Sequence, residues 1–552
     1  MTAVSSPPLW TKEGLASWRR PVQNFLSGLP GQPAPRFAES LARARTDAIF
    51  NRLSAGRPSC VSGPVLIDGM WDNPHFWLRY SLLRAALGLA NGHEIGLLGA
   101  FRRKEVAGSF RRFGVRDIRK FHDCLRITDE VRDRAGKMVA GLKEGRDIFN
   151  LDFPFGFPAG YVFDAIHKRQ RTPFVDIRHA KLTDHFVECL ATLEAADRLL
   201  EDTNPSLLVM SHSVNFHFGG LVWCAMRRNI PVVIVHGDFG LCRFVKKVPG
   251  SPLDMLEDRP YAHDLADVPE AKRQVLRDFG KAYMEARLQG TATDIGAIYS
   301  YQKRPSQIDR RQIGDRFGWN PEAPLVAVYH SVWFDWPHMS GMKHFTEFHD
   351  WITCVAARAR STPEVNWLFK DHPLNSWYQG ETLAQLGILE GASNLRIVPE
   401  DWNNTAILRS IDGVVTYFGT VGIEASAMGV PVLTADRGWY DEFGFCICPS
   451  SRHEFLDRLA TEWWLEQDRR QIMEKAHLFA GLFFCCPDWQ GNFLLPSDDH
   501  QFALYRTIPD LLYASAEPIE REIEEIRAWY ASPSRYYHNF KMSRSDRFML
   551  GN

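Results

Sequence analysis

Short apolar runs alternate with amphipathic segments along two stretches of this chain. In the first stretch, apolar runs at 65–67, 94–98 and 207–210 are followed by segment 214–228, whose apolar residues recur at helical spacing, and by a further run at 231–235. Strand, helix and strand at this spacing are typical of βαβ units. The first stretch therefore predicts a half with a parallel α/β sheet.

The second stretch begins after residue 321 and repeats the pattern more regularly. Segment 343–360 carries its large apolar residues on one helical face, between the first two of five predicted strands. The predicted strands cover 325–329, 365–369, 395–398, 413–416 and 431–434. This alternation predicts a second, Rossmann-like half. Because open parallel sheets bind ligands at the carboxyl ends of their strands, the two halves predict a ligand cleft between them.

The pattern divides the chain into four predicted parts. We expect an N-terminal helical extension at 1–60, a Rossmann-like domain at 61–305, a second one at 306–455, and a helical C-terminal return and tail at 456–552. Segment 241–305 is polar and charged, so we assign it to the first domain as its tail and as the crossing to the second.

Composition and charge exclude several classes of protein. The 552 residues include 65 Lys and Arg and 66 Asp and Glu, a formal net charge of −1, which argues against a nucleic-acid coat protein. The ten cysteines lack zinc-ribbon spacing, and no run reaches the roughly 18–20 apolar residues of a membrane span. We expect a cytoplasmic protein and keep open a peripheral contact of its N-terminal segment with the inner face of the cytoplasmic membrane.

The clearest local motif is the turn Gly419-Thr420-Val421-Gly422, which directly precedes a predicted helix. A glycine turn lets the backbone approach a ligand, and a helix N-terminus favours a phosphate group. Glu424 comes one turn later, where its carboxylate could accept hydrogen bonds from ribose hydroxyls. The alternative is an ordinary strand-turn-helix connection in which Glu424 is a favourable first-turn charge.

Polar residues also follow four other predicted strands. Lys370-Asp371-His372-Pro373 is one such end, where the proline prevents a helix and the histidine could face a phosphate. The others are His330-Ser331, with Asp335 close behind, Ser211-His212-Ser213 and His236-Gly237-Asp238. A capped loop would explain each end separately, whereas one shared ligand cleft explains all five together.

The order of these motifs resembles the capsule polysaccharide biosynthesis glycosyltransferases. The matching features are the His-Ser pair before Asp335, Trp351 on the next helix, Lys-x-His-Pro, and Gly-Thr-Val-Gly-x-Glu-Ala followed by Gly-x-Pro-Val. That family includes β-Kdo transferases and is related more distantly to other GT-B enzymes. The resemblance covers about 325–449 well and 207–243 loosely, and it implies a GT-B fold of two Rossmann-like domains.

The resemblance also implies roles for individual residues. His372 would contact the donor phosphate, Thr420, Val421 and Gly422 would donate hydrogen bonds to it, and Glu424 would bind the ribose. His330, Ser331, Lys370 and Gly419 complete the donor site that we expect. No metal and no cofactor are expected, because the helix dipole and side chains would neutralise the leaving phosphate and the nucleotide sugar is a substrate.

Inverting transfer needs a base on the acceptor hydroxyl, and we expect it from the first domain. Asp238 is the first candidate, His236 the second, and Asp335 could hold the acceptor or serve as the base. The predicted function is a metal-independent glycosyltransferase that moves a sugar, with CMP-linked Kdo as one candidate donor, to a bacterial surface or capsular glycan or glycolipid. Two alternatives stay open: a nucleotide-sugar 2-epimerase and a non-catalytic polysaccharide assembly or export partner.

Overall fold

The structure is a computed structural model, and it describes most of the chain. The described residues are 36–89, 93–100, 102–236, 243–254, 260–266, 268–292, 300–301, 307–373, 375, 380–484, 508–510, 512 and 516–538. In this part of the chain no helix is long and apolar enough to cross a membrane.

The first half is built on a seven-stranded sheet with the order β12-β6-β5-β4-β1-β2-β3. Its strands are β1 (Val65–Gly69), β2 (Glu94–Leu98), β3 (Asp117–Lys120), β4 (Leu207–Met210), β5 (Val232–His236), β6 (Arg243–Lys247) and β12 (Tyr536–His538). β1 to β5 pair in parallel, in the spatial order 3-2-1-4-5 of a Rossmann fold, whereas β6 and β12 are antiparallel additions.

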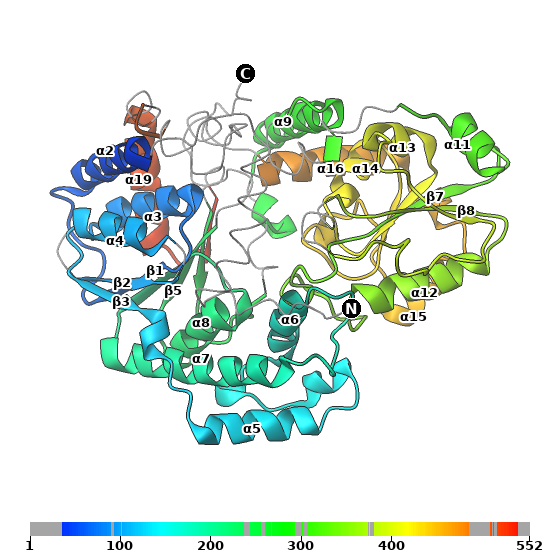
Figure 1. Cartoon of the computed structure of the whole chain (residues 1–552). Helices are drawn as coiled ribbons and strands as arrows, with labels where there is room; N and C mark the ends of the chain where they lie inside the picture. The colour runs from blue at the N-terminus through cyan, green and yellow to red at the C-terminus, as the bar shows by residue number, and fades with distance from the viewer. Residues whose placement is uncertain are drawn as a thin grey trace.

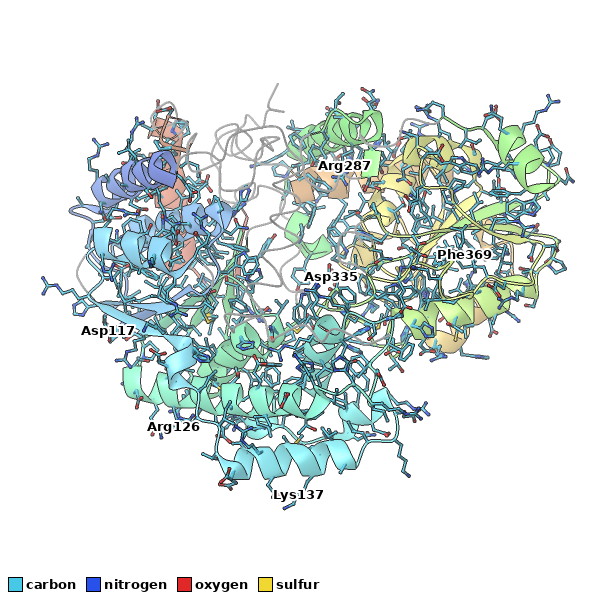
Figure 2. The ribbon with its side chains drawn as sticks, viewed as in Figure 1. Asp117, Arg126, Lys137, Arg287, Asp335 and Phe369 are labelled. Atoms are coloured by element: carbon cyan, nitrogen blue, oxygen red, sulfur yellow. The ribbon has the colours of Figure 1, made fainter. Side chains whose placement is uncertain are left out.

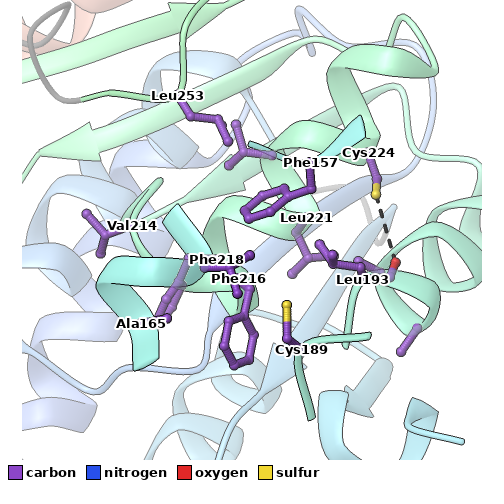
Figure 3. Packing of buried hydrophobic residues seen from close by; sticks show 14 of the residues in the cluster. Phe157, Ala165, Cys189, Leu193, Val214, Phe216, Phe218, Leu221, Cys224 and Leu253 are labelled. Atoms are coloured by element: carbon purple, nitrogen blue, oxygen red, sulfur yellow. Dashed lines mark hydrogen bonds between the residues drawn. The ribbon is translucent and has the colours of Figure 1, made fainter. Parts of the chain in front are cut away.

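Helices cover both faces of this sheet (Figure 1). On one face lie α2 (Arg36–Ser54), α3 (Pro74–Leu87), α4 (Arg103–Arg112) and α19 (Ala516–Ala531), and on the other α5 (Asp129–Ala140), α6 (Ala159–Gln170), α7 (Leu182–Thr203) and α8 (Gly220–Arg227). The strand sequence explains the two cores, because Val65 and Ile67 pack into one and Leu66 into the other. Figure 3 shows part of the second core, where Phe216 and Phe218 lie beside Ala165 of α6.

The second half repeats the same order on five parallel strands, β11-β10-β7-β8-β9. These strands are β7 (Leu325–Tyr329), β8 (Asn366–Lys370), β9 (Leu395–Ile397), β10 (Gly413–Thr416) and β11 (Val432–Thr434). α12 (Phe348–Arg360) and α15 (Arg452–Arg458) cover one face, and α9 (Glu270–Gln289), α13 (Asn404–Ser410), α14 (Val421–Ala427) and α16 (Arg469–Phe484) cover the other. Two Rossmann-like sheets in one chain confirm the predicted α/β class and its GT-B arrangement.

The end segments and α9 pack differently from the four-part division that the sequence predicts. α2 lies on the first domain, where Arg43 pairs with the buried carboxylate of Asp72 at 2.8 Å. α19 packs on α3 of the same domain, and β12 extends its sheet. α9 falls within 61–305, yet it packs on α16 so closely that a Cβ on Gly280 would lie 1.9 Å from the carbonyl oxygen of His477. The apolar side of α9 therefore belongs to the core of the second domain.

Candidate functional site

The second sheet has its topological switch point between β7 and β10. The chain leaves β7 towards β8 on one side and leaves β10 towards β11 on the other, so the loops at their carboxyl ends diverge. Ligands of open α/β sheets bind at such points. His330 and Ser331 directly follow β7, and the turn 419–422 follows β10. The fold therefore brings the predicted donor-site motifs to the expected edge of the sheet.

The turn after β10 is held by local hydrogen bonds. The amide of Gly419 donates to Oγ1 of Thr416 at 3.3 Å, and the hydroxyl of Tyr440 donates to the carbonyl oxygen of Gly419 at 2.9 Å. A Cβ on Gly422 would lie 2.2 Å from that hydroxyl. The packing of Tyr440 thus requires glycine at 422, whatever the turn binds. Thr420 precedes the first turn of α14, Val421 opens it, and the side chain of Thr420 makes no cap hydrogen bond.

Glu424 lies in a buried polar network behind the turn. Its Oε1 accepts a hydrogen bond from Nη2 of Arg287 on α9 at 2.7 Å, and its Oε2 accepts one from the hydroxyl of Tyr301. The Nδ2 of Asn404 donates to the same hydroxyl at 3.2 Å. Because both carboxylate oxygens are engaged and the side chain is 4% exposed, a contact between Glu424 and a ribose would require the ion pair with Arg287 to open.

His330 is a buried histidine directly after β7. The residue is 4% exposed, and neither ring nitrogen has a partner among the described residues. Its ring lies against Trp333, with 3.8 Å between the ring centroids. Burial, together with the nearby charges of His372 and His349, holds the pKa of His330 well below its usual range, so the ring is neutral. An unpaired buried polar group costs roughly 1–3 kcal/mol, which a bound ligand could recover.

Lys370, His372 and Asp335 lie near His330. Lys370 ends β8 and is buried, and its backbone carbonyl accepts the amide of His330 at 3.0 Å. Burial lowers the pKa of His372 to about 4, although the carboxylate of Asp335 opposes this shift. Burial raises the pKa of Asp335, but the ammonium group of Lys168 and the charge of His372 outweigh it and lower the pKa. Because the charges of Lys370, His372 and Asp335 affect the pKa of one another or of His330, the four side chains form one cluster.

The loop after β7 connects the two domains through α6. Nζ of Lys168 on α6 lies 2.8 Å from Oδ1 of Asp335, and Figure 2 shows Asp335 between the two halves. Four residues before Lys168, the buried carboxylate of Asp164 accepts hydrogen bonds from Nδ1 of His338 at 2.7 Å and from the amide of Met339 at 3.0 Å. Because an ion-paired carboxylate with a lowered pKa is a weak base, the pairing disfavours Asp335 as the general base.

Asp164, Lys168 and His338 were not among the site residues predicted from the sequence. The apolar pattern of α6 assigns no chemistry to its polar residues, and the contacts that they make join segments about 170 residues apart. No signal in the sequence could have found these contacts.

The structure leaves the two first-domain base candidates undecided. Asp238 lies outside the described residues, and of His236 only the backbone is described, where it ends β5 and pairs with Arg243. Both stay predictions. The sheet of this domain has its own switch point, between β1 and β4, where Asp68, Ser211 and His212 lie together. The sequence pattern indicated Ser211 and His212 as a polar strand end, but it treated Asp68 only as the residue that ends the apolar run 65–67.

The described residues contain no group of three or more His, Cys, Asp or Glu side chains arranged to hold a metal ion. The expectation of a metal-independent, cofactor-free reaction stays a prediction.

Comparisons with known proteins give one family match. Residues 343–479 match the family described as "Capsule polysaccharide biosynthesis protein". No curated protein matches the chain.

Solved structures are similar only at a low level. They include a UDP-GlcNAc 2-epimerase from Neisseria meningitidis bound to UDP-GlcNAc, at 11% identity and a TM-score of 0.22, covering 82% of this chain and all of that one. Another is the glycosyltransferase SnogD from Streptomyces nogalater, at 13% identity and a TM-score of 0.24, covering 82% of this chain and 100% of that one. A third is the spinosyn rhamnosyltransferase SpnG complexed with spinosyn aglycone, at 16% identity and a TM-score of 0.24, covering 81% and 99%. At these TM-scores the similarity says nothing about what this chain binds.

The family match covers the segment that carries Lys370, His372 and the turn 419–422. Residues 343–479 therefore match the capsule polysaccharide biosynthesis protein family, the family that the order of motifs resembles.

Proposed function

We propose that this chain is a glycosyltransferase that moves a sugar from a nucleotide-activated donor to a glycan or glycolipid acceptor. The observation that carries the proposal is the family match over 343–479, which includes Lys370 and His372 at the edge of the second sheet where His330 also lies. The two Rossmann-like domains support it, because this architecture binds nucleotides at a switch point.

In this proposal the second domain binds the donor. Lys370 supplies positive charge for the donor phosphate, and His372 and His330 are neutral rings whose nitrogens can donate or accept hydrogen bonds. A phosphate or sugar hydroxyl would be a hydrogen-bond partner for the ring nitrogens of His330, which have none among the described residues. The backbone of Gly419, Thr420, Val421 and Gly422 would border the same ligand, and Ser331 would lie beside it.

The proposed reaction is an inverting transfer without a metal ion. The acceptor hydroxyl attacks the anomeric carbon on the face opposite the leaving phosphate, while a base removes its proton. Positive side chains at the donor site would stabilise the charge that develops on the leaving phosphate. CMP-linked Kdo is the first donor to test, because the resemblance includes β-Kdo transferases.

A thermal-shift screen tests the donor site. The purified protein is heated with CMP, CDP, UDP, UDP-sugars or GDP-sugars, and a ligand at 100 times its dissociation constant should stabilise the protein by about 2.7 kcal/mol. We expect one nucleotide class to raise the melting midpoint of the wild type and not that of His372→Ala. His453→Ala is the matched control, because that histidine is 90% exposed on α15.

Three results would contradict the proposal or redirect it. No shift with any nucleotide would favour a non-catalytic assembly partner. An equal shift in His372→Ala would move the donor site elsewhere. Conversion of a UDP-sugar into its 2-epimer, without transfer, would favour the epimerase.

A further inference from the structure

A carboxylate, a hydroxyl and an imidazole form a chain of hydrogen bonds at the switch point of the first sheet. The hydroxyl of Ser211 donates to Oδ2 of Asp68, near the carboxyl end of β1. Nδ1 of His212 lies 2.9 Å from that hydroxyl oxygen, directly after β4. β1 and β4 are neighbours whose connections run to opposite sides of the sheet. This is the first-domain counterpart of the place where His330 and the turn 419–422 lie in the second domain.

The hydrogen bonds fix the tautomer of His212. The carboxylate of Asp68 accepts three described hydrogen bonds. They come from the hydroxyl of Ser211, from the amide of Met70 at 2.7 Å and from the amide of Ser211 at 3.0 Å. Ser211 therefore gives its proton to Asp68, and its oxygen has only lone pairs left for the imidazole. Nδ1 of His212 must then carry the proton, so the basic lone pair is on Nε2. The ring is held on two sides by Phe76 and Phe218, with centroid distances of 4.6 and 5.2 Å.

The need to satisfy buried backbone amides accounts for Asp68 and Ser211 but not for the imidazole of His212. Asp68 and Ser211 fulfil a local structural need, because the carboxylate satisfies backbone amides at the end of β1. The imidazole adds nothing to that need. It is half-buried, whereas the neighbouring Ser213 is buried with a hydroxyl that has no partner among the described residues.

Helix α6 connects this switch point to the donor-side cluster. The guanidinium of Arg169 lies 4.6 Å from the ring centroid of Phe216, in the segment that continues from His212. The adjacent residue on α6, Lys168, pairs with Asp335 in the loop after β7. The carboxyl-end loops of the two sheets therefore contact neighbouring residues of one helix.

We propose that His212 is the general base that accepts the proton of the acceptor hydroxyl, and that Ser211 and Asp68 are the positioning residues that orient it. The assignment rests on the proposed glycosyl transfer. The acceptor O–H bond breaks and its proton goes to Nε2 of His212, while the acceptor oxygen forms a bond to the anomeric carbon. The bond between that carbon and the phosphate oxygen breaks, and its electron pair leaves with the nucleotide. The proton on Nε2 then passes to solvent.

Kinetics of nucleotide release test the assignment in the full-length protein. CMP-Kdo, UDP-N-acetylglucosamine and GDP-mannose are the probes, and water is the acceptor when no glycan is added. We expect His212→Gln to lower kcat by roughly 10²- to 10⁴-fold, the range for loss of a general base. The melting shift with the bound nucleotide should remain, because His212 does not contact the donor domain in this assignment. Imidazole in the buffer should restore part of the activity of His212→Ala.

Matched variants separate positioning from folding. Ser211→Ala and Asp68→Asn should lower kcat while KM for the nucleotide sugar stays the same. Ser213→Ala is the control, because it removes a buried hydroxyl two residues away that bonds to none of the described groups. If His212→Gln fails to fold, the comparison between Ser211→Ala and Ser213→Ala still decides, and equal kcat values would overturn the assignment.

The outcomes distinguish this inference from the proposed function. An active wild type with unchanged kcat in His212→Gln would overturn the assignment and leave the transferase intact, and loss of activity in Asp238→Asn would then identify the base. A wild type that binds nucleotides and releases none of them from the three donors would overturn the transferase, and the assignment with it.

Discussion

Gly422 lies under the ring of Tyr440 at the first turn of α14. A Cβ at this position would lie 2.2 Å from the hydroxyl oxygen and 2.7 Å from Cζ of that ring. The ring is 1% exposed and stacks on Phe445 with 5.4 Å between centroids, so it cannot move aside. We expect Gly422→Ala to lower the free energy of unfolding by about 1–3 kcal/mol, the usual cost of overpacking a core. Chemical denaturation measures the difference.

Gly136→Ala is the control for this prediction. Gly136 lies inside α5 with no atom within 4 Å of an added Cβ, so alanine should raise stability by about 0.5–1 kcal/mol. Equal stability of Gly422→Ala and the wild type would show that Tyr440 is not packed as described. The sequence analysis predicts Gly422 as a donor-site residue, whereas the structure shows a packing reason for the glycine. A glycine in a strand-turn-helix motif indicates close approach, yet the partner here is a tyrosine 18 residues later.

Between elements, one buried ion pair joins α9 to α14. The side chains of Arg287 and Glu424 are 2% and 4% exposed, and Nη2 and Oε1 lie 2.7 Å apart. Glu424→Gln would leave the guanidinium buried without its counter-charge, which costs roughly 3–5 kcal/mol for such a pair. We therefore expect a clear fall in the free energy of unfolding, measured by denaturation. The ring of Phe484 on α16 also lies against this guanidinium, 5.6 Å away.

Glu270→Gln provides the matched comparison on the same helix. Glu270 pairs with Arg277 at 2.5 Å, but its side chain is 69% exposed, so its loss should leave the free energy of unfolding close to that of the wild type. If Glu424→Gln kept full stability and lost nucleotide binding, Glu424 would be a ribose contact and not a structural anchor.

The strands were predictable and the partners of the helices were not. The apolar runs 325–329 and 413–416 coincide with β7 and β10, because buried parallel strands are continuous apolar segments. The helical pattern of α9 was also visible, but it was assigned to the first domain. An amphipathic pattern shows that one face is buried and does not show against what. For the same reason the polar strand ends were predicted, whereas the pairs Lys168–Asp335 and Arg287–Glu424 were not.

At the scale of the whole molecule, segments from later in the chain contact the first domain in two places. The loop after β7 reaches α6 of the first domain, and after the second domain the chain returns to place α19 and β12 on the first sheet. β12 pairs with β6, so a segment close to residue 540 completes a sheet that begins at residue 65. The first domain therefore depends on both ends of the described chain.

The return of α19 and β12 should make stability depend on pH. Burial raises the pKa of Glu522 to about 8, and the hydroxyl of Tyr537 in β12, which donates to this carboxyl, opposes the shift only in part. The carboxyl is thus protonated when folded and ionised when unfolded above about pH 4.5. The contribution of this carboxyl to the free energy of unfolding is fully present below that pH. It is lost as the pH rises through 8, and the loss is on the order of a few kcal/mol.

Glu522→Gln should remove this loss, because an amide stays neutral. We expect the melting midpoint of the wild type to fall between pH 6 and pH 9 relative to that of Glu522→Gln, with faster amide exchange in 516–538 at pH 9. Glu517→Gln, on the same helix and with its side chain 82% exposed, should follow the wild type at every pH. Parallel pH curves for the wild type and Glu522→Gln would mean that the carboxyl is already ionised in the folded protein, and that the C-terminal return is held by apolar contacts such as those of Trp529 alone.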